Sequence, residues 1–290
     1  MTIVVICCFV YANLCIATYN IAFADDQPQW QEIKGEHFLI YFTGDEKFAK
    51  ESEQKAEYYY RNIALDLGYQ RYSEFWLWDN RVKIYIYPDH ASYIKATGQP
   101  EWSHGMANYK TKQIASYTWS EGFLESLLPH EIAHLIFRDF IGFKGEAPLW
   151  LDEGVAQWAE YSKRNFMKSQ VKNIFDANSI MLVNDMMKVD FKYIQLKDVL
   201  YIRATLTKEG EPGVVFLTGD ELIKNYYIQA FSMVSFLVEK YGAERFSHFC
   251  RELRDGKSFE AGLNAAYRER ISGINEFQNK WREYLLNGQK

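Results

Sequence analysis

Residues 128–134, Leu-Pro-His-Glu-Ile-Ala-His, place two histidines four positions apart, with a glutamate directly after the first. In a helix, His130 and His134 lie on one face a single turn apart, so both imidazoles can bind the same ion. Glu131 lies about 100° around the helix from His130, where a carboxylate can hold a water on that ion without being a ligand itself. The chemistry predicted for this segment is metal-assisted hydrolysis, with Glu131 as the general base.

Chance and ordinary packing are the simpler explanations of this pattern. With six histidines in 290 residues, a random His-Glu-x-x-His is expected in roughly one such chain in a hundred. The two histidines stand among apolar residues, at positions 127, 128, 132, 133 and 135–137. Histidines beside an apolar surface need polar partners, so a metal site is the better interpretation.

A third ligand must come from elsewhere, because a catalytic zinc ion keeps three protein ligands and one position for water. Glu153 begins a second helical pattern after the break at residues 142–148, and 18 residues separate it from His134. Two antiparallel helices would bring it to the ion. A third histidine close after the motif is excluded, because the next one is His248. We therefore expect zinc bound by His130, His134 and Glu153.

These residues resemble the gluzincin metallopeptidases, in particular the aminopeptidase-like branch, whose pattern is His-Glu-x-x-His, 18 residues, then Glu. Residues 150–156, Trp-Leu-Asp-Glu-Gly-Val-Ala, are similar to the Trp-Leu-Asn-Glu-Gly-Phe-Ala of that branch, with Asp in place of Asn. The resemblance implies a gluzincin-like (zincin) fold of the α+β class. It also implies zinc ligation by His130, His134 and Glu153, with Glu131 as base.

Upstream, residues 104–108, His-Gly-Met-Ala-Asn, stand about where that branch carries Gly-x-Met-Glu-Asn on a substrate-binding edge strand. The Glu of that motif grips a free peptide amine, and Ala107 replaces it here. The departure predicts an endopeptidase, with an extended substrate paired to the strand at residues 107–110. His104 could be a polar partner near that strand, but an ordinary surface histidine is the favoured interpretation.

In related peptidases a tyrosine from the C-terminal part donates a hydrogen bond to the tetrahedral oxyanion. The resemblance makes Tyr227 the candidate, with Tyr226 beside it as the second choice. The competing interpretation is that both are core aromatics, since the chain contains 21 tyrosines. The C-terminal half also resembles the small gluzincin-like domains of exported bacterial proteins.

Periodicity predicts the elements that hold these residues. The predicted strands are 36–42, 81–87 and two short ones within 107–119, and the predicted helical regions are 46–67, 91–97, 121–163 and 225–286. A hairpin is expected at 201–218, because β-branched runs flank a Gly/Pro tip. We expect an α+β part over about 30–163 and a mainly helical part over about 164–290. No polar linker separates them, so residues 25–290 are expected to form one peptidase domain.

Residues 1–24 carry no charged side chain and end in Ala-Phe-Ala before two aspartates. This pattern predicts a signal peptide and a periplasmic or extracellular protein. The alternative is an uncleaved membrane anchor at residues 3–24, which would be the only membrane contact. Cys250 is the only cysteine beyond this segment, so no intramolecular disulfide is expected in the mature chain.

The composition fits a folded protein with a real core, since 48% of the residues are hydrophobic. The net charge of −5 argues against a nucleic acid partner. Three functions stay open: a zinc peptidase acting on extended peptides, a zinc hydrolase of another substrate, and a cell-envelope binding or assembly protein that cleaves nothing or only itself. The intact Glu131 argues against the third, because a structural site has no use for a base.

Overall fold

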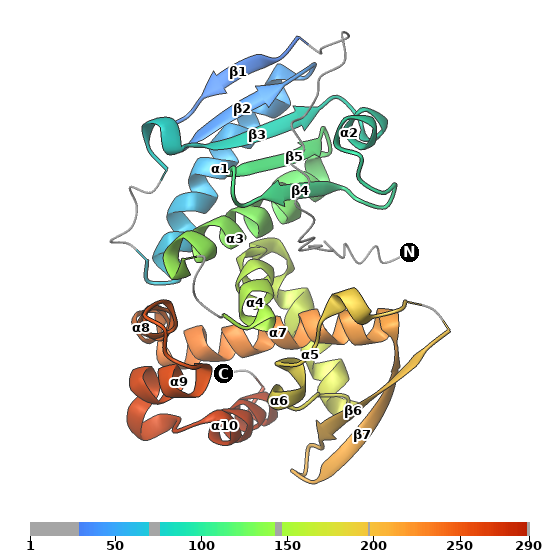
Figure 1. Cartoon of the computed structure of the whole chain (residues 1–290), viewed down its shortest axis with the longest axis vertical. Coiled ribbons are helices and arrows are strands. Elements are labelled where there is room, and N and C mark those ends of the chain that lie inside the picture. Colours follow the sequence, from blue (N-terminus) through green and yellow to red (C-terminus); the bar gives the residue numbers. More distant parts are fainter. Residues whose placement is uncertain (1–28, 70–75, 143–146, 197, 289–290) are drawn as a thin grey trace. The chain divides into compact units, whose positions relative to one another are not determined.

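The computed structural model describes residues 29–69, 76–142, 147–196 and 198–288 (Figure 1). The predicted signal peptide or anchor lies outside the described residues. The chain forms two compact units, of which the first contains residues 29–58 and 76–128. The second contains residues 59–69 and the described residues from 129 onward. None of the helices in the described part of the chain has the length and apolar character needed to span a bilayer.

The first unit is built on a mixed five-stranded sheet. Its strands are β1 (Gln31–Lys34), β2 (Phe38–Phe42), β3 (Val82–Tyr87), β4 (Gly105–Asn108) and β5 (Gln113–Tyr117). They follow the order β1-β2-β3-β5-β4. The central strands β2, β3 and β5 are parallel, and the outer strands β1 and β4 pair antiparallel with their neighbours. The strand β4 is therefore an edge strand of this sheet. The predicted substrate strand at residues 107–110 is confirmed only up to Asn108, because residues 109 and 110 lie in the turn after β4.

Alternating side chains explain why these segments are strands. In β3 every second residue is fully buried, and Ile84 lies between Ile40 of β2 and Ile114 of β5. The longer helices of this unit are α2 (His90–Thr97), the first part of α1 (Glu46–Asp66) and a π-helix at Ser120–Leu127 that leads directly into the helix beginning at Leu128. Asp89 caps α2 by accepting a hydrogen bond from the backbone of Ser92 at 2.7 Å.

The second unit is mainly helical and continues α1 past Tyr58. Its other helices are α3 (Leu128–Ile141, from its second residue), α4 (Leu149–Ala159), α5 (Arg164–Asp176), α6 (Val183–Met186), α7 (Gly219–Tyr241), α8 (Ala243–Arg254), α9 (Phe259–Tyr267) and α10 (Ile274–Leu286). A two-stranded sheet of β6 (Leu200–Leu206) and β7 (Pro212–Thr218) precedes α7. Short 3-10 turns connect some of these elements.

The helix α7 is the core of this unit, because most of its 23 residues are buried. Thr218 and Glu221 form a reciprocal capping box at its start. Gln229 in its middle exchanges two hydrogen bonds of 2.8 Å with the backbone of Met181, which fixes the segment before α6. Trp281 of α10 donates to Ser232 of α7 at 3.0 Å.

The α+β class and most predicted elements are confirmed. The predicted strands and helices agree with β2, β3, β5, α1 and α2, and the hairpin at 201–218 is β6 and β7. The helices α3, α4 and α8 to α10 fall in the predicted helical regions. Two bounds differ, because β4 begins at Gly105, before the predicted segment 107–119, and α7 begins at Gly219, six residues before the predicted start at 225. The strand β1 was not predicted, because its residues Gln-Glu-Ile-Lys are mostly exposed and polar. A gluzincin fold remains a prediction from the resemblance.

Candidate metal centre

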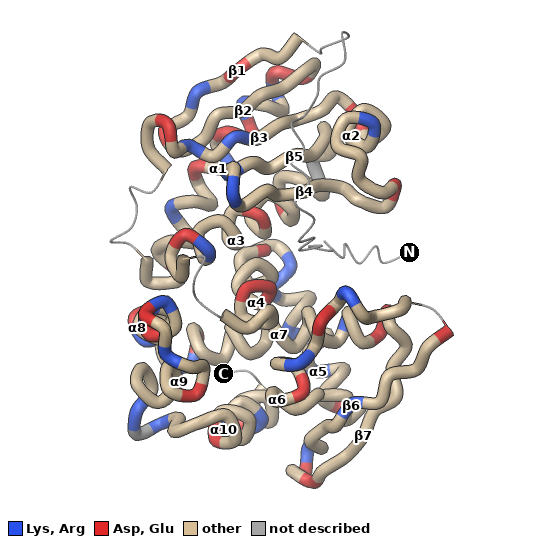
Figure 2. The backbone as a smooth tube through the Cα atoms, viewed as in Figure 1, with Lys and Arg blue, Asp and Glu red and all other residues tan. Residues whose placement is uncertain are grey.

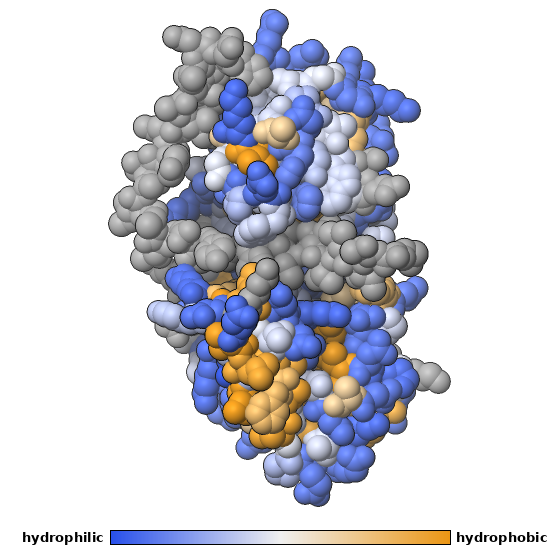
Figure 3. Space-filling model, turned by 90° about the vertical axis from the view of Figure 1, so that its right-hand side faces the viewer, coloured by the Kyte–Doolittle hydropathy of each residue, from blue (hydrophilic) through white to orange (hydrophobic). Residues whose placement is uncertain are grey.

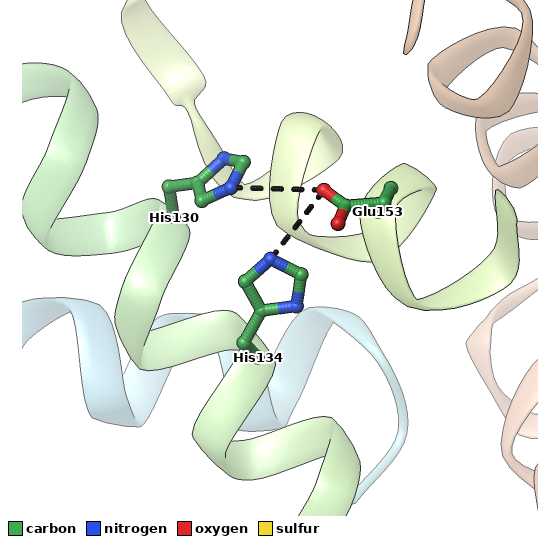
Figure 4. Close-up of side chains that lie close together, drawn as sticks. All are labelled: His130, His134 and Glu153. Atoms are coloured by element: carbon green, nitrogen blue, oxygen red, sulfur yellow. Dashed lines mark ion pairs between the residues drawn. The ribbon is translucent and has the colours of Figure 1, made fainter. Parts of the chain in front are cut away.

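Three buried side chains of the second unit converge from two helices. His130 and His134 lie one turn apart on α3, with 4.8 Å between their ring centroids, and Glu153 faces them from α4 (Figure 4). Glu153 Oε2 lies 4.0 Å from His130 Nε2 and 3.6 Å from His134 Nε2. The side chains are at most 2% exposed. The predicted ligand set is therefore brought together.

These separations suit an ion held between the three side chains. Tetrahedral ligands at bond lengths of about 2.1 Å lie roughly 3.4 Å apart. The separations of 3.6 and 4.0 Å are slightly wider than this value, and the ligand atoms of all three side chains lie within 4.8 Å of one another. Among the described residues, neither carboxylate oxygen of Glu153 nor the Nε2 of His130 has a hydrogen-bond partner. The two ring nitrogens that face Glu153 Oε2 lie at distances too long for a hydrogen bond, so a cation between the three groups would satisfy all of them.

A second layer of carboxylates orients the two imidazoles. His134 Nδ1 lies 2.6 Å from Asp152 Oδ1, and His130 Nδ1 lies 3.0 Å from Glu160 Oε1. When Nδ1 donates to a carboxylate, Nε2 is left as the ligand atom, which is the arrangement common around bound zinc. Glu160 also pairs with Lys163 at 2.7 Å. Both Nε2 atoms are therefore directed toward Glu153.

The role of Glu160 was missed in the sequence. It lies seven residues after Glu153 and directly after the end of α4, so the two positions share one face of the helix. This spacing is a weak signal, because a glutamate at that distance is common in any helix. Asp152 was visible as a variant of the family motif, but its contact with His134 was not predicted.

Local packing fixes the position of Glu153. The helix α4 begins directly after Pro148, which suits the approach to a first helical turn. Gly154 lets α4 approach α7 closely, because a Cβ there would lie 2.5 Å from the carbonyl oxygen of Ala230 and 2.7 Å from Val234 Cγ2. The residue next to the carboxylate therefore sets the distance between two helices.

The electrostatic environment suits a base beside a cation. Burial raises the pKa of Glu131 above its usual value, and the neighbouring Glu153 adds to this effect, while His130 and His134 oppose it. Burial alone would lower the pKa of His134, but the carboxylates of Asp152 and Glu153 raise it to about 10. The cluster therefore holds a proton in the position where a metal ion would bind.

The two candidate tyrosines of α7 differ in their surroundings. Tyr226 is fully buried, and its hydroxyl has no hydrogen-bond partner among the described residues. Burial, together with the carboxylates of Glu153 and Asp152, raises its pKa well above 10. Tyr227 is also buried, and its ring lies 5.6 Å from that of Phe191. Of the two tyrosines, Tyr226, which the sequence made the second choice, is therefore the one whose pKa is raised by Glu153.

His104 belongs to an aromatic cluster in the first unit. Its Nδ1 lies 2.7 Å from the hydroxyl of Tyr117, and its ring lies 4.7 Å from that of Trp119. Burial lowers its pKa, and His90 adds to this effect. The half-buried imidazole is therefore a partner of Tyr117 in the sheet.

A second group of possible ligands among the described residues is Glu36, His37 and Glu57 in the first unit. The ring of His37 bonds to Glu57 at 2.7 Å, and the backbone of His37 donates to the same carboxylate at 2.7 Å. Glu36 is exposed. Glu57 is therefore already bonded to His37, and this pair fixes the turn before β2. His130, His134 and Glu153 are the stronger candidate for a metal site.

No model of a known protein family matches the chain, and no curated protein matches it either. The case for a metal centre therefore depends on the geometry of this chain. Two histidines and a glutamate converge with atoms close enough to share one ion. This arrangement is compatible with a bound metal ion.

Proposed function

We propose that the chain is a zinc-dependent metallopeptidase that hydrolyses internal bonds of extended polypeptides. The observation that carries this proposal is the buried carboxylate of Glu153, which faces the Nε2 atoms of His130 and His134 and makes no hydrogen bond to the described residues. Two nitrogen ligands and one carboxylate ligand are a set that catalytic zinc ions take. In keeping with the N-terminal pattern, we place this activity outside the cytoplasm.

The proposed mechanism assigns one role to each side chain. His130, His134 and Glu153 would hold the ion, and zinc, when bound, would lower the pKa of a water molecule and polarise the scissile carbonyl. Glu131 would take the proton from that water and deliver it to the leaving amine. Its raised pKa suits this exchange, because a base that must also release its proton works best with a pKa near the working pH.

Oxyanion stabilisation would come from a tyrosine of α7. We propose Tyr226 ahead of Tyr227, because Glu153 influences the ionisation of Tyr226 and its buried hydroxyl has no partner among the described residues. A hydroxyl that lacks a partner in the resting protein can donate to charge that develops during the reaction.

The test measures metal content and hydrolysis in three proteins. We expect stoichiometric zinc in the wild type and in Glu131→Gln, and a strong loss of zinc in His134→Ala. We also expect Glu131→Gln to hydrolyse a mixed peptide library at least ~100-fold more slowly, the scale expected for loss of a general base. His248→Ala is the matched control, because this partly exposed histidine of α8 lies outside the candidate ligand set and pairs with Glu252 at 3.0 Å.

Equal, substoichiometric zinc in the wild type and His134→Ala would show that the ligand assignment is wrong. Unchanged turnover in Glu131→Gln would remove the mechanism. Zinc without hydrolysis of any peptide would direct attention to the two other functions, a hydrolase of non-peptide substrates and a binding protein of the cell envelope.

A further inference from the structure

The hairpin of β6 and β7 exposes an apolar face. Leu200 and Ile202 of β6 are 66% and 58% exposed, and Val214 and Phe216 of β7 are 64% and 60% exposed. The register pairs Ile202 with Phe216, so these side chains share one face of the sheet. Hydrophobic residues gather on the surface that carries this hairpin (Figure 3). Contiguous apolar surface of this kind marks a site of interaction.

The same hairpin has one open edge. On the β6 side, Thr205 forms a bridge with Met181, and the carbonyl of Ala204 accepts from the backbone of Leu182 at 3.0 Å. On the β7 side, no further strand of the described chain follows. The backbone N–H and C=O of Ala204 point away from β7, so Ala204 and Val214 form a pair without mutual hydrogen bonds. The N–H and C=O of Val214 therefore point away from β6 to the open edge, and those of Phe216, two residues later, do the same.

Apart from Pro212 at its first position, β7 has no residue that protects this edge. Natural edge strands are blunted by charged residues, proline, bulges or a covering element. Residues 213–218, Gly-Val-Val-Phe-Leu-Thr, contain no charge, and the tube of β7 is tan, neither blue nor red, between its ends (Figure 2). An uncharged edge of this length is a template for pairing with another extended strand.

The hairpin leads into α7, the helix that packs on α4 beside Glu153. Within α7, Tyr226 lies eight residues after Thr218, about 12 Å along the helix axis. Phe191 packs on Tyr226 with ring centroids 5.0 Å apart, and the 80% exposed Tyr193 follows two residues later. The carbonyl of Tyr193 lies 3.4 Å from the hydroxyl of Tyr201 on β6. A chain of aromatic residues thus connects Tyr226 of α7 with the hairpin.

The kind of partner follows from the edge and the face together. In a bilayer the outward backbone groups of β7 would have no hydrogen-bond partner, which hydrocarbon does not tolerate. Antiparallel pairing of β7 with a second copy would satisfy those groups, but it would put two apolar faces side by side and double the exposed surface. An extended peptide satisfies the edge, and its alternate apolar side chains pack beside Val214 and Phe216.

We infer that β7 is a docking strand for extended substrate segments with apolar side chains at every second position. This inference rests on the proposed peptidase function and names its substrate class. Backbone pairing supplies affinity, and the alternation supplies selectivity. Unfolded or unpaired β segments of proteins have this pattern, whereas helical and highly charged segments do not.

The test measures binding in the full chain carrying Glu131→Gln, so that the peptide stays intact. The probe is a fluorescent ten-residue peptide, blocked at both ends, that alternates valine with threonine and carries a lysine near each end. We expect saturable binding by anisotropy and at least about tenfold weaker binding after Phe216→Asp, a scale typical of a lost apolar anchor. Leu286→Asp on α10 is the matched control, since Leu286 is 51% exposed, and should bind the probe like the parent.

A backbone variant separates pairing from general apolar adhesion. Val214→Pro removes an N–H that points away from β6, so the hairpin keeps its ladder while the open edge loses a donor. We expect about tenfold weaker binding, and a similar loss when the probe is N-methylated at alternate residues. Circular dichroism of each variant checks that the fold is retained.

The inference would be overturned if Phe216→Asp and Val214→Pro both bind the probe as tightly as the parent protein. It would also be overturned if vesicles of phosphatidylcholine and phosphatidylglycerol bind and the peptide does not, or if the chain is a dimer that Val214→Pro dissociates. Failure of the proposed function gives a different result. If the wild type binds the probe but hydrolyses no peptide, the docking strand stands and the peptidase function is wrong. If instead short peptides are hydrolysed and the hairpin variants bind the probe like the parent protein, the peptidase function stands and the docking strand is wrong.

Discussion

Each of the two histidines is held on the side away from Glu153 by a carboxylate. Asp152 binds the Nδ1 of His134, and Glu160 binds the Nδ1 of His130. This arrangement fixes the orientation of both rings and makes their Nε2 atoms better ligands. It also concentrates negative charge, so that a cation or a proton is needed at the centre. Metal binding and protonation therefore compete for the same place.

This competition predicts that zinc binding releases a proton. In the metal-free protein the pKa of His134 is about 10, because Asp152 and Glu153 outweigh the effect of burial, so the imidazole is protonated at pH 7. The ion needs the neutral imidazole. We expect about one proton released per zinc ion at pH 7, and an affinity that rises by up to about tenfold per pH unit between pH 7 and 9. Calorimetry in buffers of different ionisation enthalpy measures both quantities.

The raised pKa of His134 also determines how the stability of the metal-free protein depends on pH. Since the pKa is raised from 6.5, the proton stabilises the metal-free fold fully below pH 6.5, and this contribution is lost as the pH rises through about 10. The metal-free protein thus loses stability over the range in which it gains affinity for zinc. An affinity that stays constant from pH 7 to 9, with no proton released, would contradict this account.

Glu160 is predicted to position His130. We expect Glu160→Gln to lower zinc affinity by about 10-fold and Glu160→Ala by up to about 100-fold, because an amide still accepts from Nδ1 and a methyl group does not. Competition with a chromogenic chelator measures both. The control is Glu252→Gln on α8, whose carboxylate bonds to His248 at 3.0 Å. Zinc affinity unchanged in both Glu160 variants would show that the contact is only structural.

The acid sensitivity of this pair has a defined direction. Burial alone would raise the pKa of Glu160, but His130 and Lys163 lower it to about 2. Its contribution to stability is therefore fully present above pH 4.5 and is lost as the pH falls through about 2.

The contact between α4 and α7 determines where the third ligand lies. Gly154 is the point of closest approach, since a Cβ there would meet the carbonyl oxygen of Ala230 at 2.5 Å. A backbone atom cannot move aside as a flexible side chain can, so an added methyl group must separate the helices. Glu153 precedes this glycine and would move with the helix.

We therefore expect Gly154→Ala to lower both stability and zinc affinity. Overpacking of a buried contact costs about 1–3 kcal/mol. The free energy of unfolding, from urea titration with and without zinc, measures the loss. Gly262→Ala in α9 is the matched control, because its Cβ would meet only side-chain carbons of Leu253 and Phe249, at 3.3 Å. A Gly154→Ala protein with wild-type stability and full zinc would show that the helices have room to adjust.

Local periodicity was sufficient to predict most elements of the fold. The alternation in β3 and the spacing of the two histidines on α3 are properties of a few neighbouring residues. The candidate ligand Glu153 could be named because it lies in a second helix at the spacing of the family that the sequence resembles. Glu160 and Gly154 could not be found this way. Their roles depend on contacts with His130 and with Ala230 of α7, which no local pattern contains.

The division into two units was equally hidden. The first unit ends at Leu128, one residue into α3, and no Gly/Pro-rich or polar linker stands there. A boundary that falls inside a helix leaves no change of composition to detect. The exposed apolar face of β6 and β7 was also not foreseen, because alternating strands predict one buried face and say nothing about what covers the other.

The last prediction concerns the position of cleavage. The strand β4 is an edge strand that carries Ala107, with a half-buried side chain and no acidic group at that position. A peptidase that removes N-terminal residues must pair the ammonium group of its substrate, since an unpaired buried charge is costly. A polypeptide that continues past the cleaved bond brings no such charge. We therefore expect cleavage within chains.

The measurement compares an internally quenched peptide blocked at both ends with its free-amine counterpart at equal concentration. We expect similar rates, within about threefold, and the same internal bond cleaved in both, because neither recognition nor catalysis requires the amine. Faster hydrolysis of the free-amine peptide by the wild type, with single residues released from its N-terminus, would show that another acid binds the amine and that the enzyme is an aminopeptidase.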